Sequence, residues 1–160
     1  MAASRFDAIT KAVAADRWPL YFFGLAGRGK SMAAAMVYSQ WPEDGEIGPR
    51  FWPSGKIIPD LVDARFSGGW SKIRNTVQTA SLIVIDDVAD RDMTDARRAA
   101  LLDILNWREP KPLILTGNFN PTELTTVLKD DRLVSRILRG QQREFGGPDL
   151  RLLEMKIVTI

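Results

Sequence analysis

The chain of 160 residues contains no cysteine and no histidine. The lack of cysteine excludes disulfides and thiolate metal sites, and the lack of histidine removes the commonest general base and metal ligand. Any catalysis must therefore use carboxylates, amides, arginine, lysine and a bound metal ion. The sequence also lacks a signal-peptide pattern and an apolar run of about 18 residues, the length that a membrane-spanning helix needs. We therefore expect a cytoplasmic protein with no membrane partner.

Length and composition are those of one globular domain, expected over residues 1–160. Hydrophobic residues make up 45% of the chain and charged residues 26%, which is enough for a full core under a polar surface. The net charge of +2 permits contact with nucleic acid without requiring it, so any such contact must come from a local patch.

Strand-like and helix-like segments alternate along the chain. Apolar and β-branched runs predict strands at 20–23, 56–58, 81–86, 112–116 and 153–158. Helical periodicity predicts helices at 3–16, 31–40, 59–65, 70–79, 94–107 and 121–138, the last in one piece or two. Residues 41–55 are rich in proline and glycine and predict an irregular loop. This alternation predicts an α/β fold, in which a mainly parallel five-stranded sheet is covered by helices on both faces.

One segment matches the phosphate-binding loop G-x-x-x-x-G-K-[ST] and lies between a predicted strand and a predicted helix. Glycines in such a loop let backbone N–H groups approach phosphates, and the helix N-terminus favours negative charge. We expect Lys30 to neutralise phosphate charge and Ser31 to ligate Mg²⁺. The residues predicted to bind the nucleotide are Gly24, Leu25, Ala26, Gly27, Arg28, Gly29, Lys30 and Ser31.

A second motif is the apolar run that ends in the acidic pair Asp86-Asp87. Beside a phosphate loop, the first carboxylate is expected to hold Mg²⁺ through water, and the second is expected to polarise the attacking water. Carboxylates after a strand also cap the next helix, and only the phosphate loop favours the catalytic interpretation. Aspartate is one methylene shorter than the glutamate that many ATPases have there, so the identity of the general base stays open.

Two further groups of polar residues follow along the chain. Asn118 comes directly after a predicted strand, where a side chain can reach the ligand crevice of a parallel sheet, although Gly-Asn also forms turns. Arg132, Arg136 and Arg139 lie at i, i+4 and i+7 of a predicted helix and so share one face. That face is either a solvated stripe or a surface that offers an arginine to the ATP site of a neighbouring subunit. Sequence physics leaves both interpretations open.

Together these motifs resemble the AAA+ ATPase core of the DnaC-type helicase loaders and the IstB-type transposition helper ATPases. The resemblance covers roughly residues 4 to 160, and its matching stretches are 24–31, 82–88, 101–108, 111–118 and 131–136. It implies a P-loop NTPase sandwich of three layers with sheet order 5-1-4-3-2 and no helical lid domain after the last strand. It also implies ATP hydrolysis with ATP and Mg²⁺ as cofactors, in a bacterial or phage-infected cell.

The same resemblance implies roles for individual residues and partners. Asp86 and Asp87 would be the Walker B acids, Asn118 the sensor 1 residue, and Arg136 the arginine finger with Arg132 in support. A homo-oligomer, single-stranded DNA, and a replicative helicase or another DNA-transaction protein would be its partners. Loaders of this family usually carry an N-terminal helicase-binding domain, whereas only about 20 residues precede the phosphate loop here.

The sequence leaves open an alternative function and the question of DNA binding. A small P-loop kinase is the alternative function, although the Thr-x-Asn strand end and the Asn-x-Arg helix end do not fit it. Binding of single-stranded DNA would need a basic patch, with Trp70 stacking on a base, unless these charges are scattered and Trp70 is partly buried. The candidate patch residues are Trp70, Lys72, Arg74, Arg91, Arg97 and Arg98.

Overall fold

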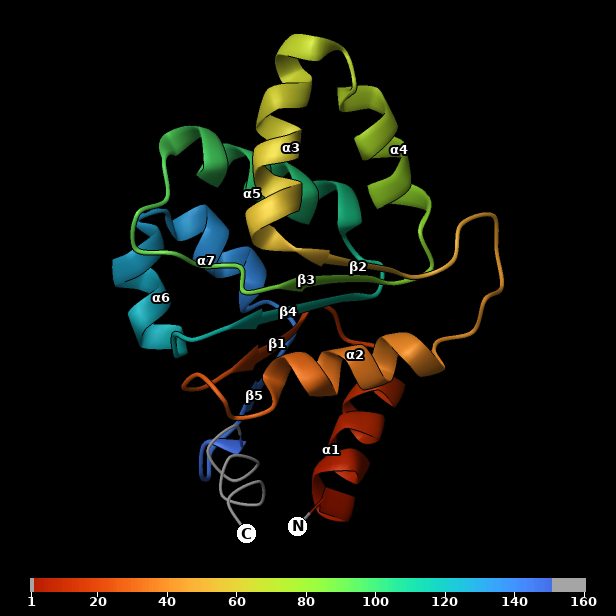
Figure 1. The fold of residues 1–160 in the computed structure, drawn as a ribbon, viewed down its shortest axis with the longest axis vertical. Coiled ribbons are helices and arrows are strands. Elements are labelled where there is room, and N and C mark those ends of the chain that lie inside the picture. The colour runs from red at the N-terminus through yellow and green to blue at the C-terminus, as the bar shows by residue number, and fades with distance from the viewer. Residues whose placement is uncertain (1, 151–160) are drawn as a thin grey trace, which may run out of the picture.

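The computed structural model describes residues 2–150, and the side chains of residues 5–150. Its centre is a parallel sheet with the strand order β2-β3-β4-β1-β5 (Figure 1). The strands are β1 (Leu20–Phe23), β2 (Arg50–Pro53), β3 (Ile83–Asp86), β4 (Leu113–Gly117) and β5 (Gln141–Glu144). The helices are α1 (Ala2–Ala14), α2 (Lys30–Gln40), α3 (Ser54–Ser67), α4 (Trp70–Thr79), α5 (Asp95–Arg108), α6 (Pro121–Leu128) and α7 (Asp131–Ile137).

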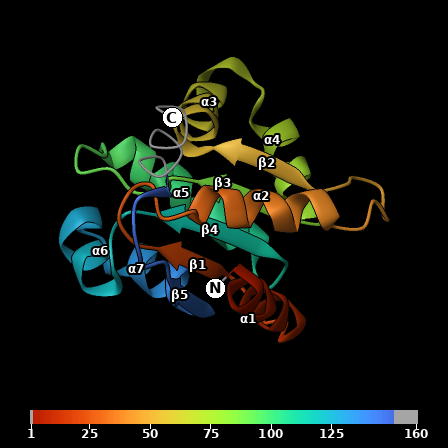
Figure 2. The same cartoon turned by 60° about the horizontal axis from the view of Figure 1, so that its bottom comes forward.

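Two layers of helices enclose this sheet. Helices α1 and α2 cover one face, and α3 to α7 lie on the other (Figures 1 and 2). Successive strand residues point to opposite faces, so the strands β1 to β4 contribute side chains to two separate cores. The side chains of Leu20, Phe22, Leu82, Val84 and Ile114 pack toward α1 and α2, and those of Tyr21, Ile83, Ile85 and Leu115 toward the other layer. The predicted three-layer sandwich and its strand order are confirmed.

The second strand was predicted at the wrong place. Residues 56–58 belong to α3, where Ile57, Ile58 and Leu61 are buried at helical spacing. The strand is β2, which lies inside the predicted loop 41–55 and pairs with β3 along its whole length. A short apolar run such as 56–58 fits a helix or a strand equally well. Here residues 50–53 pair with β3, and residues 56–58 lie in the helix that follows.

The fifth strand was also missed. Strand β5 has the sequence Gln-Gln-Arg-Glu, which carries no apolar pattern, and it pairs with β1 through its backbone. The strand predicted at 153–158 lies outside the described residues. The helix predicted over 121–138 is in two pieces, α6 and α7. In the part of the chain that the structure describes, no helix is long and apolar enough to cross a membrane.

The topology brings the predicted motifs to one edge of the sheet. All neighbouring strands are parallel, so β1, β3 and β4 end at the same edge. The register pairs Phe23 at the end of β1 with Gly117 at the end of β4. The phosphate loop, the acidic pair and Asn118 therefore leave the sheet side by side, at its carboxyl edge.

Candidate functional site

The loop between β1 and α2 has the backbone conformation that its glycines allow. Gly24, Gly27 and Gly29 have φ values of +142°, +76° and +87°. Gly24 also lies against the residue that follows β5, because a Cβ atom there would be 2.4 Å from the carbonyl oxygen of Phe145. Gly29 precedes α2 with no side-chain cap, so no side chain at this position covers the first N–H groups of the helix. The loop can therefore present backbone donors to an anion.

Lys30 lies inside this loop rather than in solvent. Only 6% of the residue is exposed, and its ammonium donates hydrogen bonds of 2.8 Å to the carbonyl oxygens of Gly24 and Leu25. These bonds hold the positive charge at the centre of the loop. A phosphate bound by the loop would therefore meet the ammonium without a large movement of the side chain.

A chain of hydrogen bonds joins the phosphate-loop helix to the ends of β3 and β4. The Ser31 hydroxyl donates to Asp86 Oδ1 at 2.7 Å, and the Thr116 hydroxyl donates to the same oxygen at 2.6 Å. The backbone N–H of Asp87 donates to Thr116 Oγ1 at 2.9 Å. Thr116 was not predicted as a site residue, although it stands in the Thr-x-Asn pattern that the sequence displayed. Thr116 therefore contacts the carboxylate of Asp86 and the backbone of Asp87.

Asp87 has a strained backbone and a perturbed carboxyl group. Its φ of +62° is in the left-handed region that non-glycine residues rarely occupy, and Ser54 donates a hydrogen bond to its carbonyl oxygen. Burial raises the pKa of Asp87, the negative charges of Asp86 and Asp90 raise it further, and Lys30 opposes them. A carboxylate with a raised pKa is a better proton acceptor than an ordinary aspartate, as a general base requires.

An open cleft at this edge unites three of the predicted site residues, Asp86, Asp87 and Asn118. The start of α3 forms one wall of the cleft, and the segments after β3 and β4 form the others. Arg91 and Phe119 also line it, with the guanidinium of Arg91 5.1 Å from the centre of the Phe119 ring. The full lining is Pro53, Ser54, Gly55, Asp86, Asp87, Ala89, Asp90, Arg91, Asp92, Asn118 and Phe119.

The oxygen atoms of Ser31 and Asp86 are suitable ligands for Mg²⁺, which prefers hydroxyl, carboxylate, phosphate and water oxygens. Among the described residues, no group of three or more acidic side chains is placed to hold a metal ion. A Mg²⁺ ion here would therefore take most of its ligands from phosphates and water, as this ion does in other nucleotide sites.

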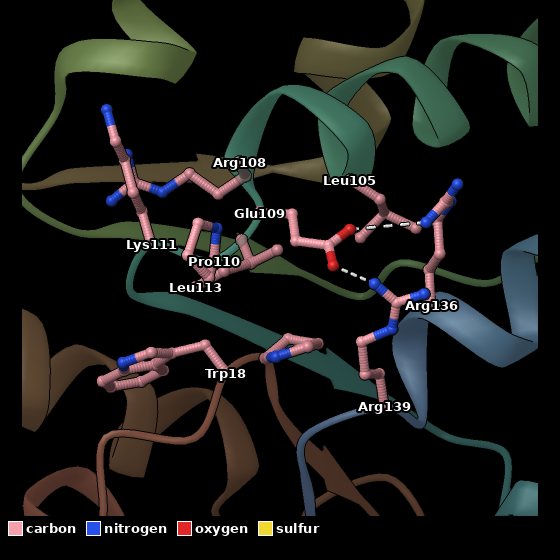
Figure 3. A pocket seen from close by; sticks show the side chains of 10 residues that line it. Trp18, Leu105, Arg108, Glu109, Pro110, Lys111, Leu113, Arg136 and Arg139 are labelled. Carbon is pink, nitrogen blue, oxygen red and sulfur yellow. Dashed lines mark hydrogen bonds and ion pairs between the residues drawn. The ribbon is translucent and has the colours of Figure 1, made fainter.

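Arg136 and Arg139 lie elsewhere, at the amino edge of the sheet. Arg136 Nη1 is 3.4 Å from Glu109 Oε2, and Arg139 forms an ion pair with the other oxygen of the same carboxylate (Figure 3). Trp18, Pro19 and Leu113 line the same small pocket, just before or at the starts of β1 and β4. Arg132 is exposed and pairs with Asp130 at 3.0 Å. The structure therefore brings neither Arg132 nor Arg136 to the phosphate loop of its own chain.

Trp70, the aromatic residue of the predicted DNA patch, is not the most exposed aromatic residue of the α3–α4 hairpin. Trp70 is half-buried, because it packs edge-on against Trp107 and has the guanidinium of Arg74 5.3 Å above its ring. Its ring is therefore poorly placed to stack on a base. Phe66, at the end of α3, is 90% exposed and was not predicted from the sequence. A lone exposed aromatic on a helical hairpin has no signal in the sequence pattern.

The chain is similar to a protein of known sequence and to several solved structures. No protein-family model matches the sequence. The relative is named as an ATP-binding protein in an insertion sequence of Mycobacterium tuberculosis. It is 25% identical over 157 residues, which cover 90% of this chain and 62% of the relative. The chain thus spans less than two thirds of that protein.

Two solved structures share the fold. The replication initiator DnaA bound to AMPPCP and single-stranded DNA superposes with a TM-score of 0.71, at 20% identity over 96% of this chain and 50% of that one. The DnaC helicase loader superposes with a TM-score of 0.69, at 24% identity over 79% of this chain and 77% of that one. The fold is that of an AAA+ P-loop NTPase. The predicted resemblance to helicase loaders and insertion-sequence ATP-binding proteins is confirmed.

Proposed function

We propose that this chain is an ATP-dependent switch that hydrolyses ATP and acts on single-stranded DNA together with a partner protein. One observation carries the proposal: the hydrogen bond from Ser31 to Asp86 joins the phosphate loop to the cleft that Asp87 and Asn118 also line. A loop that binds phosphate, an acidic pair and a polar amide at one edge are the parts that hydrolysis of a phosphoanhydride requires. The names of the relatives, which include ATP-binding and AMPPCP-bound proteins, support the nucleotide.

In this proposal each residue at the carboxyl edge has its own role in binding or hydrolysing ATP. The loop amides and Lys30 bind the phosphates, while Ser31 and Asp86 would hold Mg²⁺, which shields phosphate charge when bound. Asp87 orients the attacking water and accepts its proton. Asn118 contacts that water or the γ-phosphate from the end of β4. If Asp86 has this role, Asp86→Asn keeps part of its nucleotide affinity and loses Mg²⁺-dependent hydrolysis.

The nucleobase is assigned to an apolar pocket that begins beside Gly29 in the phosphate loop. Helices α1 and α2 and the segment after β5 form its walls. An apolar, partly aromatic lining suits a flat base next to a polar phosphate site. The side chains around it are those of Arg5, Phe6, Ile9, Met32, Ala33, Met36, Phe145, Pro148 and Leu150.

A second subunit is proposed to complete the site. Arg136 lies at the opposite edge of the sheet from its own phosphate loop, so it can serve an ATP site only in a neighbouring copy. Such an arginine typically contributes about 10³–10⁵ in hydrolysis rate. The monomer is then a poor ATPase, and activity per subunit rises with protein concentration.

The α3–α4 hairpin is proposed to contact DNA. It projects from the β2 side of the sheet (Figure 1), and it places Phe66 in solvent at the end of α3. The charged residues of α4 are Lys72 and Arg74, both positive. Stacking of a base on an exposed aromatic contributes about 1–3 kcal/mol, and nearby cations bind phosphates. Phe66→Ala is therefore expected to weaken binding of single strands without unfolding the protein, with Trp70→Ala as the comparison that damages packing.

Replicative helicase loading and DNA transposition remain the two candidate processes. The loader interpretation follows from the shared fold with DnaC, and the transposition interpretation follows from the relative encoded in an insertion sequence. Both need an ATPase that responds to DNA, whereas a small-molecule kinase does not. The first experiment therefore measures ATP hydrolysis with and without single-stranded DNA, over a series of salt and protein concentrations. An unchanged rate and a DNA affinity that does not fall with salt would reject the switch.

A mixing experiment tests the shared site. Arg136→Ala should bind ATP almost normally and hydrolyse it far more slowly, while Lys30→Ala should bind it about 10- to 100-fold more weakly. Mixing the two inactive variants should restore part of the activity, because some interfaces then pair an intact loop with an intact arginine. If turnover is independent of concentration and mixing restores nothing, the arginines act within their own chain or only coat its surface.

A further inference from the structure

Tyr21 connects the first strand to the turn that carries Asn118. The residue lies in the middle of β1, with 0% of its surface exposed. Its hydroxyl donates a hydrogen bond of 2.6 Å to the carbonyl oxygen of Phe119. Burial raises the pKa of the Tyr21 phenol far above its ordinary value, so the hydroxyl keeps its proton at every physiological pH. The bond therefore persists as a donor contact to the turn.

Gly117 is shaped to receive the same phenol. A Cβ atom added to Gly117 would lie 2.5 Å from the Tyr21 hydroxyl oxygen and 3.1 and 3.2 Å from two of its ring carbons. The hydroxyl thus fills the space that any side chain at position 117 would need. The tyrosine and the glycine fit as a pair, one from β1 and one from β4.

These contacts surround Asn118 and leave its side chain exposed in the cleft. On one side, the N–H of Val88 donates to the Thr116 carbonyl at 2.9 Å, and Gly117 packs against Tyr21. On the other side, Tyr21 holds the Phe119 carbonyl. The backbone is therefore fixed before and after Asn118.

We propose that Tyr21 is a positioning residue, which holds the turn 117–119 so that the amide of Asn118 faces the γ-phosphate end of the cleft. The inference rests on the proposed function, in which Asn118 takes part in ATP hydrolysis. Tyr21 touches neither nucleotide nor water in this role and acts through the backbone of the turn. Loss of its hydroxyl slows the chemical step and leaves nucleotide binding intact.

The main test compares Tyr21→Phe with the wild type and with Asn118→Ala. Tyr21→Phe keeps the ring and its packing, and kcat should fall about 5- to 10-fold, the effect of one hydrogen bond, while the ATP dissociation constant changes less than about 2-fold. In the Asn118→Ala background the same substitution should have no further effect on kcat. Tyr38→Phe, at the other tyrosine of the chain, is the matched control and should change neither quantity. Multiplicative effects of Tyr21→Phe and Asn118→Ala would overturn the proposal.

A second variant tests the fit between the two side chains. Gly117→Ala forces its methyl group against the Tyr21 hydroxyl, so the variant should lose both stability and kcat. Removal of the hydroxyl in Tyr21→Phe/Gly117→Ala relaxes the closest contact from 2.5 to 3.1 Å, and part of both losses should be recovered. If the double variant is as impaired as the product of the single ones, the pair is not coupled and the proposal fails.

A third measurement does not depend on hydrolysis. Backbone amide hydrogen exchange at residues 118–120 should be about 5- to 10-fold faster in nucleotide-free Tyr21→Phe than in the wild type, with exchange in α5 unchanged. Unchanged exchange in the turn would reject the role of Tyr21. A wild-type protein that hydrolyses no ATP would instead reject the proposed function, and the exchange result would still decide whether Tyr21 holds the turn.

Discussion

Lys30 and Arg108 are both buried cations, and they lie at opposite edges of the sheet. Lys30 is 6% exposed and Arg108 1% exposed, and each donates hydrogen bonds to backbone carbonyls. Arg108 bonds to the carbonyls of Val77, Ala80 and Pro112, at distances of 2.6 to 3.0 Å. Burial lowers the pKa of Arg108 to about 10, still far above neutrality, so the guanidinium stays charged.

The carbonyl groups that accept their hydrogen bonds explain why Arg108 and Lys30 have different roles. Arg108 joins the end of α4, its own helix α5 and the segment before β4, and the carbonyl end of a helix favours positive charge. Lys30 bonds to carbonyls of an irregular loop that phosphate would cover in the proposed function. A buried cation at the amino edge thus holds the scaffold together, whereas the one at the carboxyl edge would meet a phosphate in the proposed function.

The largest expected effect is on stability, from Arg108→Leu. The change leaves the buried carbonyls of Val77 and Ala80 without their donor, and each unsatisfied group costs about 1–3 kcal/mol, so we expect a loss of about 2–5 kcal/mol. Urea denaturation measures it. Arg108→Lys is the control, because it keeps the charge and loses the planar fork of donors. Its free energy of unfolding should lie between that of the wild type and that of Arg108→Leu. A loss below about 1 kcal/mol would remove the contrast with Lys30.

Lys30→Ala should give the opposite result. Loss of a charged hydrogen-bond donor to phosphate weakens ATP binding by about 1.5–3 kcal/mol, roughly 10- to 100-fold or more, while the free energy of unfolding changes by less than about 1 kcal/mol. Nucleotide titration and urea denaturation of the same sample provide both numbers. Lys11→Ala on the exposed side of α1 is the matched control. Unfolding of Lys30→Ala would make this lysine structural, like Arg108.

Thr116→Val tests the chain of hydrogen bonds at the carboxyl edge of the sheet. Valine keeps the shape and removes the hydroxyl that bridges Asp86 Oδ1 and the N–H of Asp87. We expect a loss of about 1–2 kcal/mol in stability and slower hydrolysis, with nucleotide affinity retained. Thr116→Ser restores the hydroxyl and should restore hydrolysis. Equal rates for the valine and serine variants would show that the bridge does not orient the acidic pair.

The smallest effect is expected at Asp130, which caps α7 and accepts hydrogen bonds from Arg132. The hydrogen bond from the Arg132 side chain lowers the pKa of Asp130. Its carboxylate therefore stabilises the fold above the ordinary aspartate pKa, and that contribution is lost as the pH falls through the lowered value. Asp130→Ala should cost about 1 kcal/mol at pH 7. Asp130→Asn keeps a cap without charge, so its difference from the wild type should vanish in acid; a constant difference would exclude the charge as the cause.

Local sequence was sufficient for the parts of the molecule whose backbone is set by neighbours in the chain. The phosphate loop needs glycines at fixed spacing before a helix, and the acidic pair follows an apolar run, so both could be placed from the sequence with their elements. The roles of Ser31, Asp86 and Asn118 remain predictions, although the structure brings all three to one edge. Parallel pairing explains why, since every strand then ends at the same side.

Long-range packing decided the rest. Strands β2 and β5 form because β3 and β1 offer them unpaired backbone, which no pattern in their own residues reveals. The phenol of Tyr21 meets Gly117 and Phe119 about a hundred positions along the chain. The sequence by itself determined which motifs this protein carries and in which order, because a motif is a local arrangement of residue types. Only the tertiary structure decided which edge Arg136 occupies and what holds Asn118, because those contacts exist only once distant segments pack together.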